Sequence, residues 1–172
     1  MEWPIIFNSA LVGGLVLSLV LTTIMVISAA IAPDMWVGDY PPDIKERFGP
    51  MSPRTARIRP FVATLVFAAA LAIPVIGLYD LSSIVGYIQF LPAFVFSATA
   101  LLVFNVFDLL VLDWLFFCTI QPRPTVLPGT KGMAGYRDYR FHFIGFLKGL
   151  MFCLVGGLIV ACVWLVVQMV LM

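Results

Sequence analysis

Long uninterrupted runs of apolar residues, separated by short polar segments, dominate the chain. The first uncharged run covers residues 5–32, and further runs occupy residues 61–79 and 144–172. A helix needs about 20 consecutive apolar residues to cross the hydrocarbon core of a bilayer. Each of these runs therefore predicts a membrane-spanning helix.

The region between residues 81 and 120 can be divided in more than one way. Its only charged residues are Asp108 and Asp113. One straight helix over this region would be about 55–60 Å long, against a hydrocarbon core of about 30 Å. Two spans would need about 20 residues each plus a turn, and would put the next basic loop on the opposite side of the membrane. We therefore predict one span over residues 92–114, flanked by interfacial segments at 81–91 and 115–120.

The positions of the basic residues predict an orientation. All ten Lys and Arg side chains fall in two segments, namely Lys45, Arg47, Arg54, Arg57 and Arg59, and then Arg123, Lys131, Arg137, Arg140 and Lys148, of which Lys148 lies about one turn inside the last span. Loops on the cytoplasmic side of a membrane are enriched in Lys and Arg. We therefore expect the loops 33–60 and 115–143 to be cytoplasmic, both termini to lie outside, and the membrane to be a plasma (inner) membrane.

Composition supports the same fold class. Hydrophobic residues make up 62% of the chain and charged residues 11%, whereas an average soluble domain has about 25% charged residues. We predict an all-α fold, a polytopic integral membrane protein whose four-helix transmembrane bundle carries short interfacial segments. Residues 1–172 form a single membrane domain in this prediction, and residues 43–49 form a short surface helix.

A ridge of small residues is the clearest periodic feature of the last span. Its members follow one another at intervals of four residues: Gly145, Gly149, Cys153, Gly157 and Ala161. Helices in lipid associate through close backbone contact, which small side chains permit. We interpret the ridge as a helix-packing seam, used either within the monomer or against a partner subunit or a second copy.

A polar cluster is predicted near the cytoplasmic ends of the last two spans. Counted inward from Trp114, Asp108 lies about 8–9 Å deeper and Asn105 about 13 Å. A carboxylate at the bilayer centre costs about 2.5–3.5 kcal/mol and less near the edge, so it needs a partner. The candidate cluster consists of Asn105, Asp108, Asp113, Arg137, Arg140, His142 and Lys148.

Three interpretations of this cluster remain open. In the first, Asp108 and Lys148 form a structural ion pair that joins the last two spans. In the second, Asp108, Asp113 and His142 converge on a divalent cation or a lipid phosphate, which makes them weak candidates for a metal site. In the third, Asp108 and Asn105 relay protons or cations.

Several functional classes are disfavoured. The chain has one histidine, which excludes paired-histidine catalysis and bis-histidine haem ligation within one chain. The cysteines show no metal-binding spacing, and no phosphate-binding loop of the GxxxxGK[ST] type is present. We predict no cofactor and no nucleic-acid partner, and the balance is against an enzyme.

The sequence therefore favours a subunit or helper of a membrane complex, which acts through helix packing and a basic inner face. Its expected partners are the lipid bilayer and a membrane protein or a second copy of the chain. The alternatives are an enzyme or binder of lipid headgroups or divalent cations at the polar cluster, and a small proton or cation carrier.

Overall fold

The computed structural model describes residues 3–171, and this part of the chain is an all-α bundle, which confirms the predicted fold class. In the described part, four helical segments are long and apolar enough to cross a membrane. They are α1 (Trp3–Ile31), α3 (Pro53–Val85), α4 (Phe90–Phe107) with its direct continuation η2 (Asp108–Ile120), and α5 (Tyr139–Leu171).

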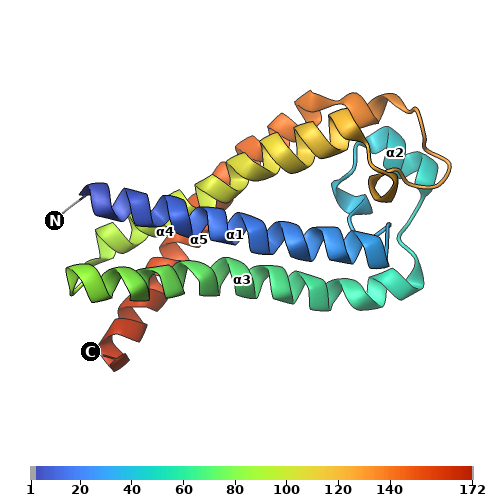
Figure 1. The fold of residues 1–172 in the computed structure, drawn as a ribbon. Helices are drawn as coiled ribbons and strands as arrows, with labels where there is room; N and C mark the ends of the chain where they lie inside the picture. The colour runs from blue at the N-terminus through green and yellow to red at the C-terminus, as the bar shows by residue number, and fades with distance from the viewer. Residues whose placement is uncertain (1–2, 172) are drawn as a thin grey trace.

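Helix α4 packs against both α5 and α1, and α1 also packs against α3, beside which it runs (Figure 1). The α4–α5 pair crosses the α1–α3 pair, and the two pairs diverge toward the end of the bundle that carries α2 (Figure 1). The start of α1, the α3–α4 turn and the end of α5 all lie at the opposite end. We call these two ends the cap end and the terminal end.

The apolar core of the bundle lies toward the terminal end. Its largest members are Trp164 of α5 and Phe96 of α4, and both side chains are fully buried. The same core contains Leu78 and Leu81 of α3 and Ile6 of α1. All four long helices therefore meet around one apolar centre at this end.

The cap end is closed by residues 32–52 and 121–138, which fold together into one small layer that we call the cap. It contains η1 (Val37–Asp39), α2 (Pro42–Phe48), η3 (Arg123–Thr125) and η4 (Ala134–Arg137). The cap has its own apolar cluster, built with the end of η2: Val37, Tyr40, Ile44, Phe117, Cys118, Leu127 and Tyr136. The predicted surface helix at residues 43–49 thus corresponds to α2.

Side-chain hydrogen bonds join the two segments of the cap. The Tyr40 hydroxyl donates to the Thr125 carbonyl oxygen at 2.9 Å, and the Gly135 amide donates to Asp43 Oδ2 at 2.9 Å. These bonds connect residues that are far apart in the sequence. The cap is therefore an ordered layer rather than a pair of independent loops.

Helix α3 extends beyond the predicted span of 61–79 at both ends. It begins at Pro53, because Ser52 caps it by accepting a hydrogen bond from the Thr55 amide at 3.3 Å. It ends at Val85, where Gly86 follows with a φ of +75°. Most of the predicted interfacial segment 81–91 is therefore part of α3 or of the start of α4.

The third span also differs from the prediction of 92–114. Helix α4 begins at Phe90 and continues without a break into η2, a π-helix that ends at Ile120. Residues 115–120 are therefore not a separate interfacial segment. The fourth span, predicted over 144–172, begins earlier, at Tyr139, because the Phe141 amide donates to Asp138 Oδ1 at 2.9 Å and fixes the helix start. Met172 lies outside the described residues.

Candidate functional site

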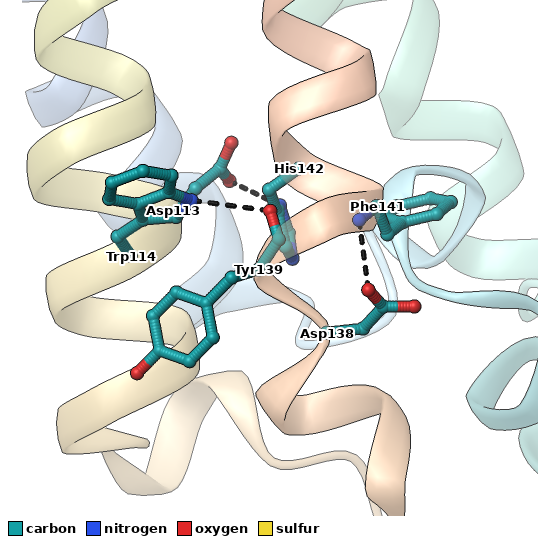
Figure 2. A network of polar contacts seen from close by, with 6 residues as sticks. All are labelled: Asp113, Trp114, Asp138, Tyr139, Phe141 and His142. Carbon is teal, nitrogen blue, oxygen red and sulfur yellow. Dashed lines mark hydrogen bonds and ion pairs between the residues drawn. The ribbon is translucent and has the colours of Figure 1, made fainter.

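The closest acid–base contact in the described part of the chain joins η2 and α5. His142 Nδ1 lies 2.9 Å from Asp113 Oδ1 (Figure 2). The His142 side chain is 6% exposed and that of Asp113 is 28% exposed. Beside this pair, Trp114 Nε1 donates to the Tyr139 carbonyl oxygen at 3.4 Å. Two adjacent residues of η2 thus hold the first turn of α5.

The π-helix explains how Asp113 reaches this position. On an α-helix, Asp113 would be turned about 140° away from Asp108. In a π-helix each hydrogen bond spans five residues, so residues five apart lie about one turn apart on the same side. The Gln121 amide, for example, donates to the Phe116 carbonyl oxygen five residues earlier at 2.8 Å. No sequence signal for this rare geometry was recognised.

The second ring nitrogen of His142 has no hydrogen-bond partner among residues 3–171. Nε2 is buried and makes no hydrogen bond to any described residue. The imidazole packs between aromatic rings, with centroids 4.8 Å from Phe117 and 5.4 Å from Phe141. When Nδ1–H donates to a carboxylate, Nε2 carries a lone pair that can accept a hydrogen bond, a proton or a metal ion. The pair therefore presents one acceptor atom in an apolar setting.

The predicted ion pair between Asp108 and Lys148 is not formed, and this interpretation is wrong for the structure. The only ion pair within 4 Å among the described residues is the one between Asp113 and His142. Lys148 is exposed and Asp108 is partly buried. The two residues come from comparable depths, but depth does not fix the direction in which a side chain leaves its helix.

Asn105 has a packing role at this level. Its Nδ2 donates to the Phe146 carbonyl oxygen of α5 at 3.2 Å. An atom added at Gly149 Cβ would collide with the Asn105 side chain. Asn105 therefore lies against the small-residue ridge of α5 and links α4 to it.

The three residues proposed as weak metal candidates are not gathered into a ligand set. Asp113 and His142 are in contact, and Asp108 lies within electrostatic reach of both. Among the described residues, however, no group of three or more His, Cys, Asp or Glu side chains is close enough to hold a metal ion. Zinc and calcium sites in proteins use more ligands than this pair offers.

The basic residues near this site remain available for other partners. Arg137, Arg140 and Lys148 are exposed, as are Arg54 and Arg57 at the start of α3. Over residues 3–171, no Lys or Arg nitrogen lies within 4 Å of a carboxylate oxygen. The positive charge at the cap end is therefore not neutralised by direct ion pairs inside the described chain.

Two acidic residues of the cap have opposite pKa shifts. Burial raises the pKa of Asp34, but hydrogen bonds from Thr55 at 2.6 Å and from the Ser52 amide at 2.7 Å outweigh it and leave the pKa below its usual value of 3.8. For Asp39, partial desolvation by the surrounding protein raises the pKa of the carboxyl group. The positive charges of Arg59 and Lys45 lower this pKa but do not outweigh the desolvation. Asp34 therefore acts as a charged anchor of the α3 start.

The ridge on α5 faces α4 along most of its length. An added Cβ at Gly157 would lie 2.9 Å from both the Cβ and the backbone nitrogen of Ala98. Cys153 and Ala161 are buried as well. Gly145 differs, because an added Cβ there would meet nothing within 4 Å. Four of the five ridge residues thus lie at intramolecular contacts or in the interior.

One structural residue was missed in the sequence analysis. Gln168 of α5 is 2% exposed, accepts a hydrogen bond from the Ile88 amide at 3.0 Å and donates to the Ile88 carbonyl oxygen at 3.3 Å. It thereby satisfies both backbone groups in the turn between α3 and α4. A single glutamine near the end of an apolar run was the available signal.

Comparisons with known proteins add no family assignment. No protein-family model, no curated protein and no solved structure matches the chain. The functional argument therefore depends on the residues described above.

Proposed function

We propose that this protein is a non-catalytic membrane subunit or helper that presents the cap to an acidic partner on the cytoplasmic side of a membrane. The observation that carries the proposal is the combination of an ordered cap with unpaired positive charge around it. Tyr40 and Asp43 tie the two cap segments together, while Arg54, Arg137 and Arg140 stay exposed.

The energetics favour a charged partner over an internal role for these side chains. An exposed ion pair contributes only about 0–1 kcal/mol to stability, so unpaired surface arginines cost the fold little. The same residues strengthen binding and speed association with a surface of opposite charge. Positive residues in both loops also support a cytoplasmic location for the cap.

The α5 ridge of small residues bears on where a partner would bind. Close packing of Gly149 and Gly157 against α4 accounts for the ridge within one chain. A partner would therefore contact the cap rather than the ridge. In this proposal the interaction occurs at the membrane surface.

Replacing four exposed arginines with glutamine tests the proposal: Arg54→Gln, Arg57→Gln, Arg137→Gln and Arg140→Gln. We expect the variant to fold normally and to lose a partner that purifies in fixed stoichiometry with the wild-type protein after gentle solubilisation. The matched control replaces the same four residues with lysine, which keeps the charge and should keep the partner. Mass spectrometry of the intact complexes gives the stoichiometry.

Two outcomes would contradict the proposal. The first is a wild-type protein that purifies as a bare monomer. The second is a partner that the glutamine variant retains as well as the wild type does. Equal melting temperatures of the three proteins would show that altered folding does not explain the result.

The buried acceptor atom of His142 favours a second candidate function, an enzyme or binder for a lipid headgroup or a cation near the inner interface. Its Nε2 is unpartnered and Asp113 fixes the ring. This candidate predicts that purified protein retains a phospholipid or a metal ion, and that His142→Phe releases it while the variant remains folded. Retention by His142→Phe would exclude a role of the imidazole in binding.

A further inference from the structure

A groove runs between α1 and α3 on the terminal half of the bundle, away from the cap. It encloses about 450 Å³, within the size range of small-molecule pockets. Its apolar walls are formed by residues such as Val12 and Val16 on α1 and Ile73 and Ile76 on α3. Val12 is 62% exposed and Ile76 is 58% exposed, so the walls face the surroundings of the bundle.

The groove exists because two glycines face one aromatic ring at its floor. An added Cβ at Gly77 would lie 2.8 Å from Cζ of Phe96, and one at Gly13 would lie 3.5 Å from the same atom. Both glycines line the groove, while Phe96 is fully buried beneath them. A larger side chain at Gly13 would start in contact with Phe96 and would take up space at the floor of the groove.

The part of the groove toward the terminal end also carries polar side chains. Asn8 and Ser9 line it on α1, and Asp80 lines it on α3. Asp80 is exposed, and no described basic nitrogen lies within 4 Å of its carboxylate. This part of the groove thus combines the apolar side chains of Leu81 and Ile84 with one unpaired negative charge, an amide and a hydroxyl.

We propose that this groove binds a phospholipid whose headgroup carries a primary amine. The acyl chain lies along the apolar walls, and the ammonium group donates charge-assisted hydrogen bonds to the Asp80 carboxylate. The amide of Asn8 and the hydroxyl of Ser9 supply donors for the lipid phosphate. This site is independent of the cap and of the function proposed above.

The charge and the open, apolar walls of the groove favour a lipid. An acyl chain is slim and flexible and can follow the walls between α1 and α3, and a headgroup amine complements the unpaired carboxylate of Asp80. The charge favours an amine over a choline headgroup, because a quaternary ammonium has no N–H to donate to a carboxylate.

Competitive lipid retention tests the proposal. The purified full chain in detergent is given equal amounts of phosphatidylethanolamine and phosphatidylcholine with identical acyl chains, and bound lipids are counted by native mass spectrometry. We expect the ethanolamine lipid to be retained about tenfold better, as one charge-assisted hydrogen bond implies. Asp80→Asn should bring the two lipids close to parity while some lipid is still retained.

Substitutions that fill the groove provide a second, independent test of lipid binding. Gly13→Leu should reduce retention of both lipids, and Val12→Trp on the groove wall should do the same if Gly13→Leu folds poorly. The control is Val166→Leu on the exposed face of α5, which should bind lipid as the wild type does. Equal retention of both lipids by the wild type, an unchanged preference in Asp80→Asn, or a second copy of the chain found in the groove by crosslinking would each overturn the proposal.

Discussion

Asp113 and His142 meet because two local structures bring them to the same place. The π-helical geometry of η2 turns Asp113 toward α5, and the Asp138 cap starts α5 early enough to include His142 in its first turn. The carboxylate then fixes the orientation of the imidazole. Each half of the pair depends on a backbone feature that lies outside the pair itself.

Removing the carboxylate should therefore destabilise the protein. Asp113→Ala leaves His142 Nδ1 buried without a partner, and losing a hydrogen bond to a charged group costs about 1.5–3 kcal/mol. Asp113→Asn keeps an oxygen that accepts from Nδ1 and should recover part of this loss. The free energy of unfolding in detergent measures both effects.

Glu46 provides the control for this change, because it is exposed on α2 and forms no ion pair with a described residue. Glu46→Ala should change stability by no more than about 0.5 kcal/mol. Replacing Asp108 and Lys148 together should change the free energy of unfolding by the sum of the two single changes, since the two side chains are not in contact. An Asp113→Ala loss no greater than that of Glu46→Ala would contradict the importance of the pair.

Asp34 should give the stability of the cap a defined pH dependence. Its pKa in the folded protein lies below the usual value of 3.8, so its stabilising contribution is complete above that value and is lost as the pH falls through the lower folded value. Asp34→Asn should cost about 1.5–3 kcal/mol near neutral pH. The difference from the wild type should shrink as the pH falls to about 3.

The difference in unfolding free energy between wild type and Asp34→Asn, measured as a function of pH, checks this expectation. A constant difference across the range would show that ionisation of Asp34 does not contribute. The comparison isolates Asp34, because every other carboxylate is common to the two proteins.

Sequence reasoning about single residues was limited by side-chain direction. Depth along a helix follows from residue number, so Asp108, Asp113, His142 and Lys148 were expected near one level. Which of them touch depends on the helix type, and the sequence analysis assumed an α-helix throughout. The expected pair of Asp108 and Lys148 is not formed, and in the π-helical segment that begins at Asp108 it is Asp113 that contacts His142.

At the scale of elements, the contact between α4 and α5 depends on the lack of side chains at two positions. Gly149 admits the Asn105 side chain, and Gly157 admits the backbone of Ala98. Packing of this kind is the main source of affinity between helices in lipid, where an apolar surface gains little from contact with another apolar surface. The fold is therefore sensitive to single added methyl groups along this line.

Gly157→Ala should destabilise the protein by about 1–3 kcal/mol, the usual cost of overpacking. Its Cβ would lie 2.9 Å from the Ala98 backbone nitrogen, which cannot move away as a side chain end can. Gly145→Ala is the matched control, because it lies on the same ridge with open space around it. This control should be neutral or stabilise the helix by up to about 1 kcal/mol.

Thermal unfolding of Gly157→Ala and Gly145→Ala in detergent tests this prediction. Equal tolerance of Gly157→Ala and Gly145→Ala would contradict the packing of α5 on α4. A loss on both changes would show that Gly145 also faces a partner in solution.

The elements themselves were largely predictable, because each long apolar run became one long helix. Their ends were less predictable. The Ser52 and Asp138 caps extended α3 and α5 into segments that were read as loop, and Gln168 fixed the turn at Ile88 through a contact between distant residues. Hydropathy detects the membrane core, whereas helix ends depend on individual hydrogen bonds.

For the whole molecule, the structure separates two regions with different chemistry. The terminal half holds the large apolar core around Phe96 and Trp164, and the cap end holds an ordered layer with exposed basic side chains. The helix pairs diverge toward the cap (Figure 1). A protein built in this way can anchor itself through one half and engage a partner through the other.

The proposal requires the cap and the α3–α4 turn to lie on opposite sides of a membrane, with the cap in the cytoplasm. Single cysteines test this in a background where Cys118, Cys153 and Cys162 are replaced by alanine. Lys131→Cys reports the cap and Tyr87→Cys the turn, and both positions are exposed. A membrane-impermeant thiol reagent added to intact cells should label Tyr87→Cys and should label Lys131→Cys only after permeabilisation. Labelling of Lys131→Cys in intact cells would contradict the account.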